Sequence, residues 1–227
     1  MKKIIFGILA CTSLFLSCSK DNDITVNLIT SGKLSVKLSD DQGISIQNTK
    51  VKLYDLNIQN DYLEALITDA NGKVNFGDVL SGSYVIAADT PKVNNIKYVP
   101  QKNIQVISGL DKEIIINVQN YSGDLSLTFK KASYLGGDPF SNLDVILVPS
   151  ELYNTSYSVA TLITKAEFSG KTNSSGIITF KIPSSRSFKL IIYNSRKTKK
   201  NAITTYEINK EELKKATFSV DTSMALA

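Results

Sequence analysis

The stretch Thr68-Asp69-Ala70-Asn71-Gly72-Lys73-Val74-Asn75-Phe76 decides the fold of this chain. An aspartate side chain can accept hydrogen bonds from its own turn, and glycine adopts positive φ without steric cost, so this pattern predicts a tight hairpin turn. Val74 and Phe76 then alternate with polar residues, which is the two-residue period of a strand with one buried face. The motif therefore predicts two short strands joined by a tight turn.

The same motif returns later in the chain. Residues 172–180 repeat it 104 positions on, with Asn173 in place of the aspartate. Three other segments also recur in the same order: 32–38 at 123–129, 51–53 at 145–147 and 83–84 at 187–188. Four segments repeated in one order indicate a duplicated unit, with the additional residues in the connections 130–142 and 151–171.

Period-two alternation dominates both units. Leu34, Val36 and Leu38 alternate with polar neighbours, so each strand has one face for a core and one for water. We therefore expect an all-β fold of two tandem sandwiches over residues 31–120 and 121–222, followed by a tail at 223–227. Asn209 followed by acids and then lysines also predicts a short helix or helical turn over 209–215.

These segments resemble a known group of domains. The order Gly-x-apolar-x-apolar, Val-x-Leu, Thr-Asp-x-Asn-Gly-x-apolar-x-Phe and Gly-Ser-Tyr is similar to the carboxypeptidase regulatory-like, transthyretin-like and Cna-B-like domains. The resemblance implies seven-stranded prealbumin/Ig-like β-sandwiches, in which the residue at Tyr84 is a core or corner aromatic. Members of this group typically serve as spacers, stalks or accessory modules of secreted and surface proteins.

The composition excludes several kinds of chemistry. The 227 residues contain no histidine and no tryptophan, and only two cysteines. Without histidine there is no Ser-His-Asp or Cys-His catalytic site and no His-ligated zinc. We expect no catalytic residues, no metal site and no cofactor.

The first residues predict export and lipid anchoring. Lys2 and Lys3 precede an apolar run at 4–16 that is too short to span a bilayer, which is typical of a signal peptide over residues 1–17. The run leads into Leu16-Ser17-Cys18, which resembles a bacterial lipobox, so Cys18 is the expected lipidation site and the membrane is the expected partner. The alternative is an ordinary secretory signal with an incidental cysteine.

Residues 18–30 are expected to form a tether. Ser19-Lys20-Asp21-Asn22-Asp23 is similar to the acidic segment that follows the cysteine of bacteroidete-type lipoproteins, where it accompanies display on the outer face of the outer membrane. A simple polar spacer, with the protein facing the periplasm, is the alternative localisation.

Two chemical sites suggested by this resemblance and by the turn sequence are disfavoured. An isopeptide bond would need Lys33 or Lys37, Asn117 and Glu64, but both lysines have the parity of the water-facing side of their strand, and burying an unpaired lysine is costly. Residues 69–72 lack most ligands of a calcium loop, so a turn is preferred. A surface Ca²⁺ at Asp40-Asp41, completed by Asp69 or Asp89, is the alternative.

Two surfaces are candidates for contact. The enlarged connections of the second unit carry the aromatic residues Tyr134, Phe140, Tyr153 and Tyr157, which could bind a ligand or simply pack the long loops. Arg196, Lys197, Lys199 and Lys200 could form a basic patch for acidic glycans or lipopolysaccharide phosphates, or a solvated hairpin tip.

The expected function is therefore contact and not catalysis. We expect a non-catalytic structural or adhesion module, anchored by lipid and displayed on the cell surface, with an envelope protein or extracellular glycan as partner. Nucleic acid is not an expected partner of an exported chain. The alternative function is a glycan- or nutrient-binding lipoprotein that assists an outer-membrane uptake system.

Overall fold

The computed structural model describes residues 29–58, 61–132 and 137–221. The predicted signal peptide, the lipidation site Cys18, the first part of the tether, Tyr134 and the tail 223–227 lie outside the described residues. None of the described helices is long and apolar enough to span a membrane.

The first unit is a sandwich of two sheets around one core. The three-stranded sheet has the order β4 (Lys73–Leu80), β1 (Ser31–Ser39), β9 (Asp111–Asn117). The four-stranded sheet has the order β3 (Glu64–Ile67), β2 (Lys50–Asp55), β5 (Gly82–Ala88), β8 (Gln101–Val106). A small hairpin of β6 (Lys92–Val93) and β7 (Ile96–Lys97) projects from the connection between β5 and β8.

The second unit has the same architecture. Its three-stranded sheet has the order β13 (Ile177–Pro183), β10 (Ser122–Lys131), β16 (Leu213–Val220). Its four-stranded sheet has the order β12 (Phe168–Lys171), β11 (Asp144–Pro149), β14 (Ser187–Tyr193), β15 (Lys200–Glu207). In each unit the first strand pairs in parallel with the last, β1 with β9 and β10 with β16. Three strands and four strands in each unit confirm the expected all-β fold of two seven-stranded sandwiches.

The buried faces follow the predicted alternation. Leu34, Val36 and Leu38 are fully buried, and their polar neighbours on β1 point away from the core. The equivalent residues of β10 are Leu125, Leu127 and Phe129, which are also fully buried. Tyr84 is a core residue whose hydroxyl donates to the Leu80 carbonyl at 2.8 Å, as the family resemblance implied.

The expected hairpin at Thr68–Phe76 is wrong in one respect. The turn itself forms, because the Asp69 carboxylate accepts from the amides of Asn71 and Lys73 and Gly72 has φ +71°. However, β3 pairs with β2 and β4 pairs with β1, so the turn crosses from one sheet to the other. Local turn chemistry does not specify strand pairing, which the neighbouring strands decide.

A short helix lies where the sequence did not predict one. α1 (Val159–Lys165) follows the 3-10 turn η3 (Ser150–Leu152), and the Ser158 hydroxyl caps it by accepting from the Thr161 amide. The helix covers the outer face of the second four-stranded sheet, where Leu162 packs with Ile146 and Ile191. The helical turn expected over 209–215 is wrong beyond residue 211, because β16 begins at Leu213.

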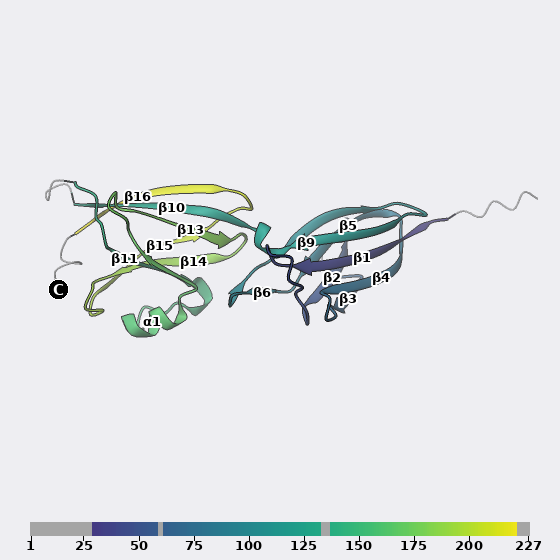
Figure 1. Ribbon diagram of the computed structural model, residues 1–227, viewed down its shortest axis with the longest axis horizontal. Coiled ribbons are helices and arrows are strands. Elements are labelled where there is room, and N and C mark those ends of the chain that lie inside the picture. Colours follow the sequence, from purple (N-terminus) through teal and green to yellow (C-terminus); the bar gives the residue numbers. More distant parts are fainter. Residues whose placement is uncertain (1–28, 59–60, 133–136, 222–227) are drawn as a thin grey trace, which may run out of the picture.

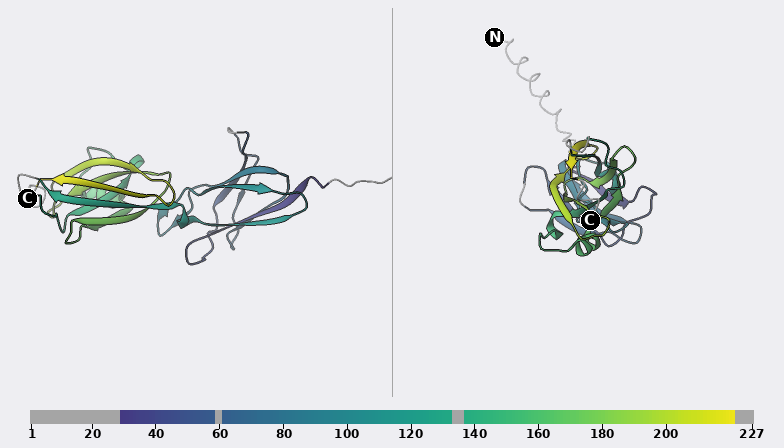
Figure 2. Two further views of the ribbon diagram at one scale, coloured as in Figure 1. Left: turned by 90° about the horizontal axis from the view of Figure 1, so that it is seen from above. Right: turned by 90° about the vertical axis from the view of Figure 1, so that its left-hand side faces the viewer.

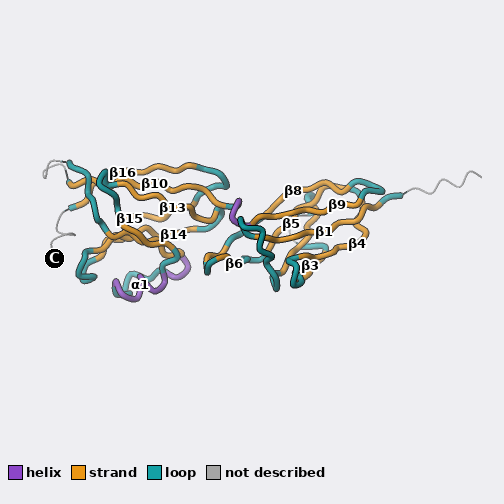
Figure 3. Tube along the Cα trace, viewed as in Figure 1, coloured by secondary structure: helices purple, strands orange, loops and turns teal. Residues whose placement is uncertain are grey.

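The two sandwiches lie end to end (Figure 1). β1 begins at one end of the molecule and β16 finishes at the other, as the view from above also shows (Figure 2). Only the 3-10 turn η1 (Val118–Asn120) and Tyr121 separate β9 from β10 (Figure 3). The molecule is therefore a rod, and the chain enters and leaves it at opposite ends.

Candidate functional site at the junction of the sandwiches

Arg186 is the central side chain of the junction. Its guanidinium forms a two-pronged ion pair with Glu167, with N–O distances of 2.6 and 3.0 Å, and reaches Glu151 at 3.4 Å. It also donates to the Lys97 carbonyl of the first sandwich at 2.8 Å. Arg186 is 9% exposed, so these bonds form away from bulk water, where charge-assisted pairs are stronger.

The chain between the sandwiches is also held by contacts with both of them. Tyr121 belongs to the core of the first sandwich, although it immediately precedes the first strand of the second. Its carbonyl accepts from the Ser184 amide at 2.9 Å, and Lys210 lies over its ring at 5.0 Å. The Gln119 side chain accepts from the Asp41 amide at 2.9 Å. The junction therefore consists of contacts between folded parts and has no free linker.

Burial affects two tyrosines at this junction. Burial raises the pKa of Tyr98, and the negative charges of Asp41 and Glu167 raise it further. Burial also raises the pKa of Tyr121, against the opposing effect of Lys210. Glu167 belongs to the second sandwich and Tyr98 to the first, so the contact between the sandwiches brings the Glu167 charge close enough to raise the pKa of Tyr98.

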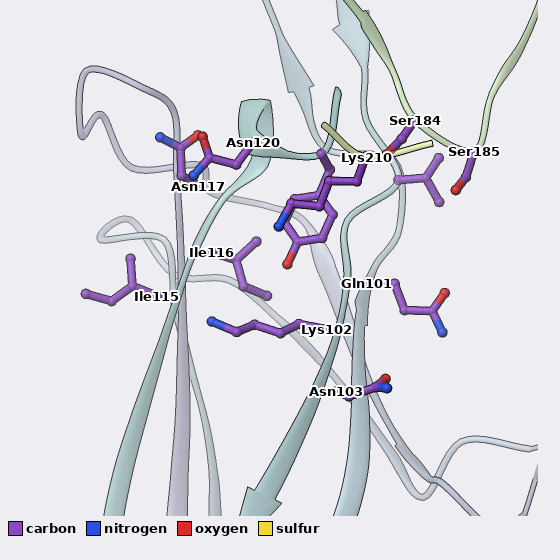
Figure 4. A pocket seen from close by; sticks show the side chains of 12 residues that line it. Gln101, Lys102, Asn103, Ile115, Ile116, Asn117, Asn120, Ser184, Ser185 and Lys210 are labelled. Carbon is purple, nitrogen blue, oxygen red and sulfur yellow. The ribbon is translucent and has the colours of Figure 1, made fainter. Parts of the chain in front are cut away.

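A polar groove of about 520 Å³ opens beside this contact. Side chains from β8, β9, the junction and the second sandwich surround it (Figure 4). Lys102 and Lys210 bring positive charge, and the amides of Asn117 and Asn120 bring hydrogen-bond donors and acceptors. Gln101 and Asn103 also line the groove, but their side chains point away from Lys102 (Figure 4). Such a set can bind an anionic, hydroxyl-rich ligand through charge and amide hydrogen bonds.

The predicted basic residues lie at the far end of the second sandwich. Residues 194–199 form the tip between β14 and β15, and Arg196, Lys197 and Lys199 are exposed there. Lys200 differs, because its ammonium donates to the carbonyls of Thr155 (2.9 Å) and Tyr157. The structure thus forms the expected hairpin tip, and the exposed cations at this tip are Arg196, Lys197 and Lys199.

The predicted aromatic residues do not form one surface. Phe140 is 6% exposed and belongs to the core of the second sandwich, so the structure corrects its assignment as a contact residue. Tyr153 and Tyr157 pack against the cluster beneath α1, and Lys189 and Lys165 lie over their rings. These three residues pack the long connections, which was the alternative interpretation; Tyr134 lies outside the described residues.

The residues considered for an isopeptide bond or a metal ion have other roles. Lys33 is exposed and Lys37 half-buried, as their parity predicted. The carboxylates of Asp40 and Asp69 accept from amides of their own turns. In the part of the chain that the structure describes, no group of three His, Cys, Asp or Glu side chains could hold a metal ion.

Sequence reasoning missed the junction. Arg186, Glu167 and Glu151 are distant in sequence, and nothing in their local pattern marks a buried cluster. One signal was available: Pro183-Ser184-Ser185 replaces the expected Leu-x-Gly, and Ser185 has φ +57° at the turn that presents Arg186. A departure from the repeat at this point marks where the second unit meets the first.

Neither protein-family models nor curated protein sequences match the chain. Among solved structures, it is similar to the minor pilin of Streptococcus agalactiae, with 15% identity, a TM-score of 0.37 and coverage of 84% of this chain and 95% of that one. It is also similar to the TIE protein of Bacillus anthracis, with 16% identity and a TM-score of 0.35. That match covers 84% of this chain and 34% of the TIE protein chain. The chain spans 62% of a streptococcal ancillary pilin, at 10% identity and a TM-score of 0.34.

Proposed function

We propose that this protein is a lipid-anchored spacer and adhesion module of the bacterial cell envelope. The observation that carries the proposal is the junction: two sandwiches are joined end to end without a linker and are held by Arg186. A rod whose chain enters at one end and leaves at the other carries its far tip away from an anchor near the first end (Figure 1).

The anchor is proposed to be Cys18, acylated after removal of residues 1–17. Several acyl chains, each worth about 0.8 kcal/mol per buried CH₂, would hold the protein on a membrane without a spanning helix. The far tip, with Arg196, Lys197 and Lys199 exposed, would then face outwards as the contact surface for an envelope protein or an acidic glycan.

Protease treatment of intact cells tests the display of the rod. We expect the protein to be degraded on intact cells, and to be released from the membrane fraction in a Cys18→Ala variant. Permeabilised cells serve as the control for intrinsic protease sensitivity. Complete protection on intact cells, with degradation after permeabilisation, would contradict surface display and favour the periplasmic orientation.

The junction groove supports a second candidate function, the binding of an acidic glycan. Lys102 and Lys210 lie on different sandwiches but line the same groove (Figure 4). On an array of charged and neutral glycans, we expect selective binding of acidic ones and its loss in a Lys102→Gln/Lys210→Gln variant. Lys181→Gln, at an exposed position outside the groove, is the matched control. Equal binding by all three proteins would remove this candidate.

A further inference from the structure

The end of the rod at which the chain enters presents an exposed apolar tip. Its residues are Ile29, Leu80, Ile107 and Leu110, which are 64%, 65%, 48% and 54% exposed. Isolated exposed aliphatic residues are ordinary, but a group at one end of a molecule indicates a contact surface. We name these four residues the entry tip.

Backbone hydrogen bonds hold the entry tip together. Ser31 pairs with Leu80 in the sheet, and its carbonyl accepts from the Gly109 amide at 2.8 Å. The Lys33 amide donates to the Leu110 carbonyl at 3.2 Å, and the Leu110 amide donates to the Ile107 carbonyl at 3.2 Å. The backbone therefore brings the start of β1, the β4–β5 turn and the β8–β9 turn together at one end.

The turns and strands of the entry tip also pack closely against one another. A Cβ built on Gly109 would lie 3.9 Å from the Ile29 Cγ2 atom, so the isoleucine side chain lies over this turn. A Cβ on Gly32 would lie 2.4 Å from the Ile107 carbonyl oxygen, which shows how closely the β8–β9 turn approaches β1. The four side chains of the entry tip are consequently exposed on closely packed backbone.

The short segment between Cys18 and Ile29 indicates that a membrane surface could cover the entry tip. Ten residues lie between Cys18 and Ile29, so at full extension these two residues are at most about 40 Å apart. If Cys18 carries the lipid, the entry tip is the part of the rod nearest the bilayer. The aliphatic side chains and the anchor then face the same lipid surface.

From these observations we propose that the entry tip inserts its aliphatic side chains into the interfacial region of the bilayer. This inference rests on the proposed lipid anchor. The two contacts together would fix the direction of the rod, because a lipid anchor at one point would leave it free to tilt.

The charge around the entry tip is mixed, with Lys33 and Lys112 beside Asp78 and Asp111. We therefore expect insertion into zwitterionic phospholipid without a need for anionic lipid.

The absence of tryptophan from the chain permits a direct test. A single reporter, Leu80→Trp or Leu110→Trp, is placed in the full-length lipidated protein and reconstituted into phosphatidylcholine vesicles. We expect the tryptophan fluorescence of the vesicle-bound protein to lie at shorter wavelength than that of the same protein in solution without vesicles. We also expect this fluorescence to lose intensity when the lipid acyl chains are brominated. Two reporter positions keep the test informative if one variant folds poorly.

The matched control is Ile115→Trp, at a residue of β9 that is 60% exposed and lies outside the entry tip. Its emission should be unchanged by vesicles and insensitive to brominated lipid. Equal behaviour of the tip and control reporters on vesicle-bound protein would overturn the inference. A shifted emission without quenching, accompanied by doubling of the protein mass in solution, would assign the tip to a second copy and also overturn it.

Vesicle flotation separates the two proposals. Protein that fails to float with the vesicles contradicts the lipid anchor and thus the proposed function. Protein that floats but shows unshifted tip reporters retains the anchor and contradicts only the insertion of the tip.

Discussion

Thr68 and Thr172 show how one side chain joins several segments of a sandwich. The Thr172 hydroxyl donates to the Phe140 carbonyl at 2.6 Å and accepts from the Leu143 amide at 3.0 Å. Thr68 forms the equivalent bonds with Ile46 and Thr49. Both threonines are almost fully buried, so their hydroxyls satisfy backbone groups that water cannot reach.

The first prediction concerns this hydroxyl. Thr172→Val keeps the branched shape but leaves a buried carbonyl and amide unsatisfied, so we expect the free energy of unfolding to fall by about 1–3 kcal/mol. Thr179→Val, at an exposed position of β13, is the control and should change it by less than about 0.5 kcal/mol. Urea denaturation measures both; equal losses would show that the hydroxyl bonds contribute nothing specific.

Gly72 and Gly176 occupy the crossing turns for two separate reasons. Gly176 has φ +72°, and a Cβ there would lie 2.3 Å from the Phe129 carbonyl oxygen. Gly72 has φ +71°, and a Cβ there would lie 2.4 Å from the Leu38 carbonyl oxygen. Each turn therefore needs glycine both for its conformation and for its close approach to the first strand of its sandwich.

The second prediction separates these two effects. Gly43 has φ +80° but open space around its Cβ position, so Gly43→Ala should cost only about 1 kcal/mol of conformational strain. Gly176→Ala adds a backbone clash, and we expect a loss of more than about 2 kcal/mol. Thermal or urea unfolding of the two variants compares them. A loss at residue 176 no greater than that at residue 43 would mean that the turn relaxes freely.

At the scale of elements, α1 distinguishes the second sandwich from the first. Val145–Val148 is a continuous apolar run because alternate residues face the core and the helix. The corresponding strand of the first sandwich, β2, alternates Val51 and Leu53 with the half-buried Lys52 and Tyr54. A strand without alternation thus marks a sheet covered on both faces.

The third prediction tests this cover. Leu162 is fully buried between α1 and the sheet, so Leu162→Ala should lower the free energy of unfolding by about 2–5 kcal/mol. Thr164→Ala, on the exposed side of the same helix, should change it by less than about 0.5 kcal/mol. Denaturant unfolding gives both values. A small effect at Leu162 would indicate that α1 leaves the sheet readily.

For the whole molecule, the junction determines whether two sandwiches act as one rod. Arg186 contacts two acids of its own sandwich and a carbonyl of the other, so it links their positions. The β6–β7 hairpin supplies that carbonyl, which gives this small element a structural purpose. A rigid rod would hold the far tip at a fixed distance from the end that carries the proposed anchor.

The fourth prediction is that Arg186→Lys loosens the junction. Lysine retains the positive charge, but its single ammonium group cannot form the planar, two-pronged ion pair with the Glu167 carboxylate and also donate to the Lys97 carbonyl. Distances between spin labels at residues 67 and 179, one on each sandwich, should be narrowly distributed in the parent protein and broader in the variant. Glu151→Gln is the control, because Glu151 is 58% exposed and its contact is longer, so its distribution should stay narrow. An unchanged distribution in Arg186→Lys would assign the rigidity to Tyr121 and its neighbours.

The sequence by itself determined the repeated unit, the buried faces and the tight turns. These properties depend on alternation, glycine conformation and side chains that bond to their own backbone, all of which are local. The tertiary structure decided which strands pair across each turn, where α1 lies and how Arg186 joins the sandwiches. It also decided that Phe140 is buried and that the entry tip forms. Each of these depends on segments far apart in the chain, whose contacts local patterns do not specify.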